Sequence, residues 1–393
     1  MQHIQYYWCY LTEIFVLLYT MFKNAISYYI TIKGLLIIFF LVFVQTINGQ
    51  ELPPIYNYTP ETYKAESQNW SIDQSKEGHL YVANNLGLLE FNGARWNLYK
   101  TPNATIMRSV KSIDDKIFTG FYMDFGYWQR DLYGVLNYIS LVKENNITIL
   151  EDEQFWNIIQ YDDWILFQSL QRIYFFNPTT KEYKIISSDV KITKLFKVNN
   201  TIYFHQFGKG LYMIKDGEAV LVSNHEIFKT NDIINIHKED NHLLLLTNSK
   251  GFVQLINNQV KLWDPPNRYL KNKKIYNSVR LKNGGFAIGT ISNGVLFLSK
   301  EGGIEYEFSL TNGLINNTVL SLFEDNRGKI WLGLDDGINS IDINSQIKVF
   351  KDTEGSIGSV YASIVFEKDL YLGTNQGLFV KRYGSNEKFK IIY

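Results

Sequence analysis

A short phrase of residues recurs along most of this chain, and it constrains the fold more than any other feature of the sequence. The phrase is an apolar or aromatic pair, a few residues, a glycine and another apolar residue. Its clear copies are Leu80-Tyr81 with Gly87-Leu88, Ile202-Tyr203 with Gly210-Leu211, Leu243-Leu244 with Gly251-Phe252, Phe286-Ala287 with Gly294-Val295, Ile330-Trp331 with Gly337-Ile338, and Leu370-Tyr371 with Gly377-Leu378. From Gly210 onward the glycines are 41, 43, 43 and 40 residues apart. A period of this length predicts a repeat architecture.

The stretch 318–350 shows what one repeat contains. It reads as four short strands at 318–323, 330–333, 338–342 and 347–350, separated by segments rich in Asp, Asn and Gly that favour tight turns. Four short antiparallel strands make one blade of a β-propeller. Weaker copies at Ile117-Phe118 and Ile165-Leu166 complete a series of eight units between about 70 and 392. We therefore predict an all-β fold, a β-propeller of seven to eight four-stranded blades, in which the recurrent glycine adopts a positive φ.

An uncharged apolar run of eleven residues occupies positions 34–44, after Lys33 and before the small residue Gly49. This order is typical of a secretory signal, and the run is shorter than the roughly 20 residues that a membrane-spanning helix needs. We expect 1–49 to be a signal segment that starts at Met21 and is cleaved after Gly49. The alternative is a retained anchor that also uses residues 10–22 and tethers the protein to a membrane. The expected location is periplasmic or extracellular.

The remaining boundaries follow from the repeat. We expect a lead-in strand or linker at 50–69, blades one to seven at 70–352, and at 353–393 either an eighth blade or the start of a truncated second propeller. The chain has 39 basic and 39 acidic residues, so its charge gives no reason to expect a polyanionic partner such as nucleic acid. Its one cysteine, Cys9, lies in the signal segment, which excludes disulfides and thiolate metal sites in the mature chain.

The sequence contains no recognisable catalytic or metal-binding motif. His79 lies at a turn and is predicted to be exposed, and His237 and His242 flank another turn, where a solvated hairpin is favoured over a metal site. The acidic pairs are also predicted to lie at hairpin turns, where Asp is favoured for its local hydrogen bonds; they are Asp114-Asp115, Asp162-Asp163 and Asp335-Asp336. We predict no cofactor, no metal and no enzymatic activity.

The segment 120–134 departs most from the repeat, and we interpret it as a long insert in the second unit that replaces a tight turn. Its aromatic and charged side chains are suited to stacking on a sugar ring or planar group and fixing its orientation. The alternative is a plug between blades, or a contact with a neighbouring domain. The candidate ligand-binding residues are Tyr122, Asp124, Phe125, Tyr127, Trp128 and Arg130, with Trp156 and Gln168 from the next unit.

Two sets of residues resemble a known family. Residues 314–337, which contain the Ile330-Trp-Leu-Gly strand, resemble the two-component regulator propeller repeat of bacterial sensors. The phrase Gly120-Phe-Tyr-Met-Asp-Phe-Gly-Tyr-Trp-Gln-Arg-Asp131 resembles one branch of that group, the triple-tyrosine, LuxR-type membrane regulators. Further stretches similar to this branch are Phe155-Trp156, Phe167-Gln-Ser169, 289–294 and 371–378. The resemblance extends over about 52–392.

The resemblance implies a function that the residue pattern alone does not. Members of this family continue with further blades, a β-sandwich, a membrane helix, a coiled coil and a helix-turn-helix. We therefore expect this chain to be the amino-terminal, ligand-sensing part of a signal-transducing transcriptional regulator, without direct nucleic-acid binding. Its expected partners are an unknown extracellular ligand, for which a glycan is one candidate, and the rest of the regulator or a membrane partner. The alternatives are a propeller enzyme that acts on extracellular polysaccharide and a protein-interaction scaffold.

Overall fold

The computed structural model describes residues 52–239, 241–350, 355–383 and 389–392, and these residues form two compact units. Residues 52–349 make one unit, which consists of seven four-stranded antiparallel sheets. The other unit contains one more sheet of the same kind. The expected signal segment 1–49 lies outside the described residues. The prediction of an all-β chain built from repeated four-stranded sheets is confirmed.

The first three blades follow one another along the chain, and in each the strands lie in sequence order. Blade 1 comprises β2 (Asn69–Gln74), β3 (Leu80–Asn84), β4 (Gly87–Phe91) and β5 (Trp96–Lys100). Blade 2 comprises β6 (Met107–Ile113), β7 (Lys116–Phe121), β8 (Asp124–Arg130) and β9 (Leu136–Ser140). Blade 3 comprises β10 (Asn157–Tyr161), β11 (Trp164–Gln168), β12 (Arg172–Phe176) and β13 (Tyr183–Ser187).

The next three blades repeat this order. Blade 4 comprises β14 (Ile192–Val198), β15 (Thr201–Gln206), β16 (Gly210–Lys215) and β17 (Glu218–Ser223). Blade 5 comprises β18 (Ile233–Glu239), β19 (His242–Thr247), β20 (Gly251–Ile256) and β21 (Gln259–Leu262). Blade 6 comprises β22 (Ile275–Arg280), β23 (Phe286–Thr290), β24 (Val295–Leu298) and β25 (Ile304–Phe308). Short helices connect an outer strand to the next inner strand: α2 (Pro60–Tyr63), α3 (Leu141–Glu144), α4 (Glu226–Thr230) and α5 (Asp264–Leu270).

The seventh blade is assembled from both ends of the unit. Its inner three strands are β26 (Val319–Glu324), β27 (Ile330–Leu334) and β28 (Ile338–Ile341), and its outer strand is β1 (Ile55–Tyr58), paired antiparallel with β28. The expected outer strand at 347–350 is therefore wrong: Val349 makes only an isolated bridge to Leu52. The edge of β28 is covered by the first strand of the unit, which no periodicity in the sequence could reveal.

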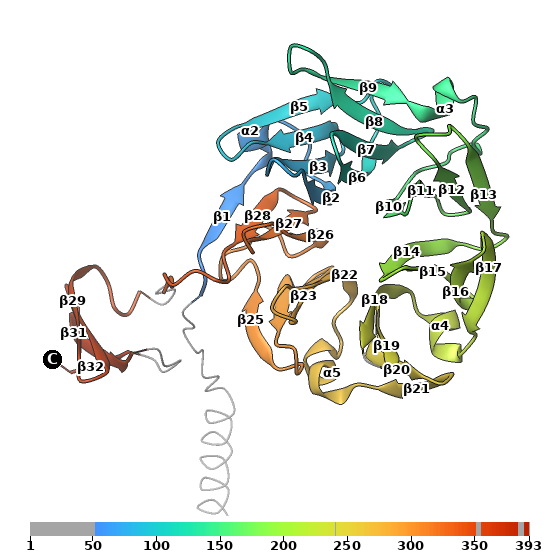
Figure 1. The fold of residues 1–393 in the computed structure, drawn as a ribbon. Helices are drawn as coiled ribbons and strands as arrows, with labels where there is room; N and C mark the ends of the chain where they lie inside the picture. Colours follow the sequence, from blue (N-terminus) through green and yellow to red (C-terminus); the bar gives the residue numbers. More distant parts are fainter. Residues whose placement is uncertain (1–51, 240, 351–354, 384–388, 393) are drawn as a thin grey trace, which may run out of the picture. The chain divides into compact units, whose positions relative to one another are not determined.

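The seven blades form a closed ring, with the first strand of each blade innermost (Figure 1). Each inner strand contacts the inner strand of the next blade, and β26 of blade 7 contacts β2 of blade 1. In six blades a serine or asparagine on the inner strand donates a hydrogen bond to a backbone carbonyl of the neighbouring blade. These bonds run from Ser71 to Val110, Ser109 to Phe155, Asn157 to Leu195, Asn235 to Ser278, Asn277 to Leu320, and Ser321 to Asn69. The last of them closes the ring.

The hydrophobic core is divided into seven clusters, and each cluster lies between two neighbouring blades. Between blades 6 and 7, for example, Phe297 and Phe308 pack with Leu332 and Ile341, all fully buried. Between blades 7 and 1, Trp331 joins Val82 and neighbouring residues. A single four-stranded sheet cannot bury both of its faces, so each blade is stabilised by the two beside it.

The recurrent glycines have the predicted backbone conformation. Gly210 has φ +126° and Gly294 has φ +71°, and the equivalent glycines of the other copies also have positive φ. A Cβ atom at Gly294 would lie 1.9 Å from the carbonyl oxygen of Phe308, and one at Gly210 would lie 2.3 Å from that of Ser223. The position therefore requires glycine for two reasons, which are the positive φ and the close approach of the fourth strand.

The other unit contains an eighth sheet with the topology of a blade. Its strands are β29 (Val360–Phe366), β30 (Asp369–Thr374), β31 (Gly377–Arg382) and β32 (Lys390–Ile391), in sequence order. The pairing of β29 with β30 shifts between Val360 and Ala362, as it does near the start of most inner strands of the ring. All seven residues of β29 are exposed.

Candidate functional site at the axis of the ring

The inner strands of the ring share an irregularity close to their first residue. In six of the seven blades the pairing with the second strand shifts there, so that one residue bulges out of the ladder. A bulge re-aims the side chain that it carries. The bulged residues are Trp70, Arg108, Thr193, Ile234, Tyr276 and Leu320, and the corresponding residue of blade 3 is Trp156, just before β10.

Three of these residues form a stack that spans blades 1 to 3. The guanidinium carbon of Arg108 lies 4.1 Å from the ring centroid of Trp70 and 4.5 Å from that of Trp156. The two indoles are themselves edge to face, with centroids 5.9 Å apart and an interplanar angle of 87°. Arg108 Nε donates to Gln154 Oε1 at 2.9 Å, and Trp70 Nε1 donates to Asn85 Oδ1 at 2.7 Å. These two cation–π contacts and the bond to Gln154 restrict the orientation of the guanidinium.

A fourth side chain near Arg108, that of Tyr276, comes from the far side of the ring. It stands on the inner strand of blade 6, which does not adjoin blade 2, yet its hydroxyl and the Arg108 guanidinium influence one another. Burial raises the pKa of Tyr276, and the positive charge of Arg108 opposes that rise. Burial likewise lowers the pKa of Arg108. We call Trp70, Arg108, Gln154, Trp156 and Tyr276 the axial cluster.

The axial cluster has hydrogen-bond donors without acceptors. Arg108 Nη1 and Trp156 Nε1 are both buried and bond to none of the described residues. No Asp or Glu among the described residues forms an ion pair with Arg108. A buried donor left unpaired costs about 1–3 kcal/mol, so the cluster favours a group that brings acceptor atoms.

Of the residues predicted from the sequence, only Trp156 belongs to the axial cluster. Gln168 is fully buried and donates to the carbonyl oxygens of Ser169 and Ile192 at 2.7 and 3.1 Å. It therefore ties blade 3 to blade 4. The sequence analysis missed Trp70, Arg108 and Tyr276. An alignment of the repeats on the residue before the inter-blade serine or asparagine would have shown tryptophan, arginine or tyrosine at this position in blades 1, 2, 3 and 6, and isoleucine or leucine in blades 5 and 7.

The segment 120–134 is not a long insert, and that prediction is wrong. Residues 124–130 are the regular third strand of blade 2, β8, connected to β7 by the two residues Tyr122 and Met123. Met123 has a positive φ, +61°, in the turn where blades 1, 4, 5, 6 and 7 have a glycine with positive φ. Because the aromatic residues lie in a strand, they alternate between the two faces of the blade instead of gathering on one loop.

Three of the predicted side chains on β8 are buried. Phe125 is fully buried and stacks on Phe167 with a centroid separation of 4.2 Å. Trp128 is 4% exposed, and its Nε1 donates to Thr119 Oγ1 at 3.0 Å. Asp124 accepts a 2.7 Å hydrogen bond from Ser140 Oγ, and burial raises its pKa. These residues contribute to packing between blades 1, 2 and 3.

The other predicted residues on this segment lie nearer the surface. Tyr122 donates its hydroxyl proton to Asp152, and this hydrogen bond raises the pKa of the tyrosine. Tyr127 is half-buried, with Lys116 Nζ 4.7 Å from its ring centroid. The structure thus distributes the predicted residues among the core, the surface and the axial cluster, and it does not bring them together as one site.

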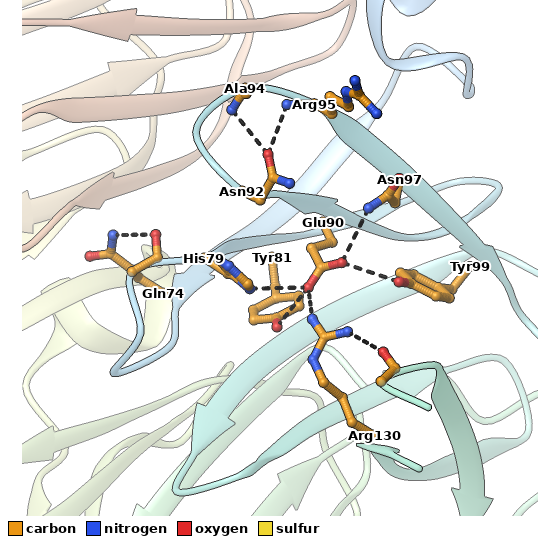
Figure 2. A network of polar contacts seen from close by, with 12 residues as sticks. Gln74, His79, Tyr81, Glu90, Asn92, Ala94, Arg95, Asn97, Tyr99 and Arg130 are labelled. Carbon is orange, nitrogen blue, oxygen red and sulfur yellow. Dashed lines mark hydrogen bonds and ion pairs between the residues drawn. The ribbon is translucent and has the colours of Figure 1, made fainter. Parts of the chain in front are cut away.

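Arg130 belongs to a polar network between blades 1 and 2 (Figure 2). At its centre is Glu90 on β4, whose side chain is only 3% exposed. The Glu90 carboxylate pairs with Arg130 Nη2 and accepts the hydroxyl protons of Tyr81 and Tyr99 at 3.0 and 3.1 Å. His79 Nδ1 lies 3.3 Å from the same carboxylate, so the expectation that His79 is an unspecialised surface residue is wrong. The bonded partners of Glu90 make this network a brace between blades.

His237 is the histidine that burial affects most clearly. It lies on β18 with Nε2 buried and unbonded, and its ring meets Phe286 with centroids 5.5 Å apart. Burial, reinforced by the charge of Arg280, lowers its pKa to about 4, although Glu239 acts in the opposite direction. No group of three or more His, Cys, Asp or Glu side chains in the described part of the chain could hold a metal ion.

We expect the stability of the ring to fall by about 2–3 kcal/mol through His237 alone between pH 7.5 and pH 4.5. The unfolded chain, with a histidine pKa near 6.5, binds a proton in this window that the folded protein does not, so unfolding is favoured as the pH falls. Urea titrations at the two pH values measure the loss. His237→Gln and His237→Phe should both reduce the pH dependence by this amount, and an unchanged pH dependence would contradict the assignment.

The comparisons with known proteins agree with this architecture. A family model described as two component regulator propeller matches residues 313–336, which include all of β26 and β27. This chain carries a two-component regulator propeller repeat. No curated protein matches the chain. Among its described residues, the regulator propeller has no helix of the length and apolarity that crossing a membrane requires.

Solved structures show the same fold. The extracellular domain described as that of a hybrid two component system, BT3049 from B. thetaiotaomicron, matches with a TM-score of 0.65 and 19% identity, over 88% of this chain and 49% of that one. The extracellular domain described as that of a one component system, BT4673 from the same organism, matches with a TM-score of 0.60 and 17% identity, over 87% of this chain and 47% of that one. This chain therefore spans about half the length of those domains. A streptogramin B lyase matches with a TM-score of 0.57 and 13% identity, over 74% of this chain and 98% of that one.

Proposed function

We propose that this regulator propeller is the extracytoplasmic, ligand-sensing region of a signal-transducing transcriptional regulator, and that it binds its ligand at the axial cluster. The observation that carries the proposal is the contact of the Arg108 guanidinium with the indoles of both Trp70 and Trp156, close to donors that lack acceptors. Aromatic faces and a few convergent polar groups are the usual content of a ligand site. The extracellular domains with the same fold support a location outside the cytoplasm.

The way a bound ligand would act follows from the construction of the site. The axial cluster draws its side chains from blades 1, 2, 3 and 6, so a ligand that contacts all of them favours one relative arrangement of these blades. A ligand shifts such an equilibrium only by its difference in affinity for the two arrangements. The rest of the regulator would read that shift as the signal. We propose no chemical conversion of the ligand by this chain.

The second candidate function is an enzyme that acts on extracellular polysaccharide. A streptogramin B lyase shares the fold, and a fold does not determine which reaction, if any, takes place on it. The axial cluster contains an arginine, a tyrosine, a glutamine and two tryptophans, and no carboxylate or histidine to serve as the usual general acid or base. This composition favours binding over catalysis.

A thermal-shift screen of the purified chain against oligosaccharides released from plant and host polysaccharides tests the proposal. At a concentration of 100 times Kd, a ligand stabilises a protein by about 2.7 kcal/mol, which raises the melting temperature by several degrees. We expect at least one such shift for the wild-type chain and its loss in Trp156→Ala. Chromatography of the same mixtures should show no new products.

Trp164→Ala is the matched control, because Trp164 is a partly buried tryptophan of the same blade that meets Phe175 edge to face, outside the axial cluster. It should melt at a lower temperature and still respond to the ligand. A shift that persists in Trp156→Ala would place the ligand elsewhere, a screen without any shift would contradict the sensing role, and new products would favour the enzyme.

A further inference from the structure

The inner strands of the ring carry more positive than negative charge. Their basic residues are Arg108, Lys111, Lys194, Lys197, Lys238 and Arg280, and their acidic residues are Asp73, Glu239 and Glu324, which leaves a net charge of +3. The whole chain has a formal net charge of zero. The excess at the axis is therefore a local separation of charge, and it attracts anions.

Four of these cations, Arg108, Lys194, Lys197 and Lys238, form no ion pair with an Asp or Glu among the described residues, and burial lowers the pKa of two of them, Arg108 and Lys194. Lys111 pairs with Asp73 at 2.9 Å, and Arg280 pairs with Glu239 at 2.5 Å, so those charges are compensated. Among the described residues, neither Arg108 nor Lys194 has an acidic partner within ion-pair distance. Taking a cation out of water without a counter-ion is unfavourable, so both residues favour a ligand that supplies one.

Lys194 interrupts a structural pattern of the ring. In the other six blades the residue after the bulge is the serine or asparagine that bonds to the neighbouring blade, and in blade 4 this residue is Lys194. It makes no such bond, and desolvation lowers its pKa to about 8. Blade 4 thus has a lysine on its inner strand in place of an inter-blade hydrogen bond.

The buried polar atoms of the axial cluster that lack a hydrogen-bond partner are all donors. Arg108 Nη1 and Trp156 Nε1 are donors, whereas Gln154 Oε1 and Asn85 Oδ1, the acceptors beside the stack, already bond to Arg108 and Trp70. An arginine presents its donors in a planar fork that matches a carboxylate or a sulfate. A neutral sugar hydroxyl would satisfy some of these donors, but it would leave both charges uncompensated.

We propose that the axial cluster, together with Lys194, binds the anionic group of an acidic ligand, a carboxylate or a sulfate. This inference rests on the proposed sensing function and narrows the chemical class of its ligand. Arg108 receives the anion on the part of its guanidinium that the two indoles leave uncovered. Side-chain adjustment on binding brings the buried donors to the ligand, as is common at interfaces. Lys194 supplies the second positive charge.

The test uses the anions themselves, sodium acetate and sodium sulfate, with sodium chloride at equal ionic strength as the reference. The chain is labelled with 5-fluorotryptophan, and the ¹⁹F signals of Trp70 and Trp156 are assigned with Trp70→Phe and Trp156→Phe. We expect acetate or sulfate to shift these two signals saturably in the millimolar range, while chloride does not. Acetate and sulfate titrated separately distinguish a carboxylate site from a sulfate site.

The variants isolate the charges. Arg108→Gln is expected to weaken the anion about tenfold or more, since one charge-assisted contact is worth roughly 1.5–3 kcal/mol. Arg108→Lys keeps the charge and loses the planar fork of donors, so its affinity for the anion should lie between those of the wild type and Arg108→Gln. Lys194→Met should weaken anion binding while the chain stays folded. Lys197→Met is the matched control on the same strand, because Lys197 Nζ already donates to the Gln160 carbonyl at 2.8 Å.

The outcomes separate this inference from the proposed function. Equal responses to acetate, sulfate and chloride, or unaltered anion binding in Arg108→Gln, would overturn the anion inference. If a neutral oligosaccharide shifts the Trp70 and Trp156 signals equally in wild type and Arg108→Gln, the sensing role stands and the anion inference falls. If acetate or sulfate binds but no oligosaccharide from the screen does, the anion site stands and the sensing role is contradicted.

Discussion

Replacing Trp128 with alanine is expected to lower the free energy of unfolding by about 3–5 kcal/mol, the usual cost of deleting a buried tryptophan side chain. Trp128 is 4% exposed and packs between Tyr99 and Tyr138, with centroid separations of 6.1 and 5.2 Å. The alanine leaves a cavity at the interface of blades 1 and 2 and frees the Thr119 hydroxyl. Urea denaturation followed by circular dichroism measures the loss.

Trp128→Phe is the control for this prediction. It keeps most of the apolar volume and removes only the 3.0 Å bond from the indole Nε1 to Thr119 Oγ1, so its cost should be about 1–2 kcal/mol. The response to ligand in the thermal-shift screen should survive in both variants. An alanine variant that unfolds at the wild-type urea concentration would mean that Trp128 is not part of the core.

Arg130→Met is expected to cost about 3 kcal/mol, because it leaves the carboxylate of Glu90 buried without its main counter-ion. Breaking one side of a buried ion pair is more unfavourable than removing both charges. Glu90→Gln should therefore cost less, since the Arg130 side chain is 37% exposed and can turn toward water. The amide oxygen can still accept from one of the two tyrosines, Tyr81 or Tyr99, and the amide nitrogen can donate to the hydroxyl oxygen of the other.

The double variant Glu90→Gln/Arg130→Met makes this prediction specific to the pair. It should be more stable than Arg130→Met alone, and the coupling between the two substitutions should exceed about 1 kcal/mol in a double-mutant cycle. Purely additive effects would contradict the role of the network as a brace between blades 1 and 2. Urea denaturation of the four proteins at neutral pH provides the cycle.

The blades were predictable because one geometric requirement recurs in each of them. The fourth strand approaches the start of the third so closely that Gly87, Gly210 and Gly294 cannot be replaced without a clash. That requirement marks the sequence every 40 to 43 residues. In blade 2 the first residue of the third strand is Asp124, which follows Met123, so the recurrent glycine is absent. A regular strand was therefore misread as an insert.

The axial cluster was less predictable, because its members are brought together by the closure of the ring. Trp70 and Tyr276 are more than 200 positions apart, and nothing local to either residue shows that it faces the axis. Their shared property is the bulge, a feature of strand pairing that leaves no fixed residue type. Trp156 was predicted for another reason, as part of a family phrase, and the structure places it beside Arg108.

The pairing of β1 with β28 also determines when the ring can be completed. Asn57 and Asn339, whose side chains meet across this pairing, are 282 residues apart in the chain. Each of the other sheets pairs strands that follow one another directly, so these hairpins can form as soon as they are synthesised. Strand β1 is the first strand of the ring to be synthesised, yet β28, the strand with which it pairs, is the last. Until then one side of blade 7 and one side of blade 1 are uncovered, and the chain depends on its surroundings to keep these surfaces from pairing with another molecule.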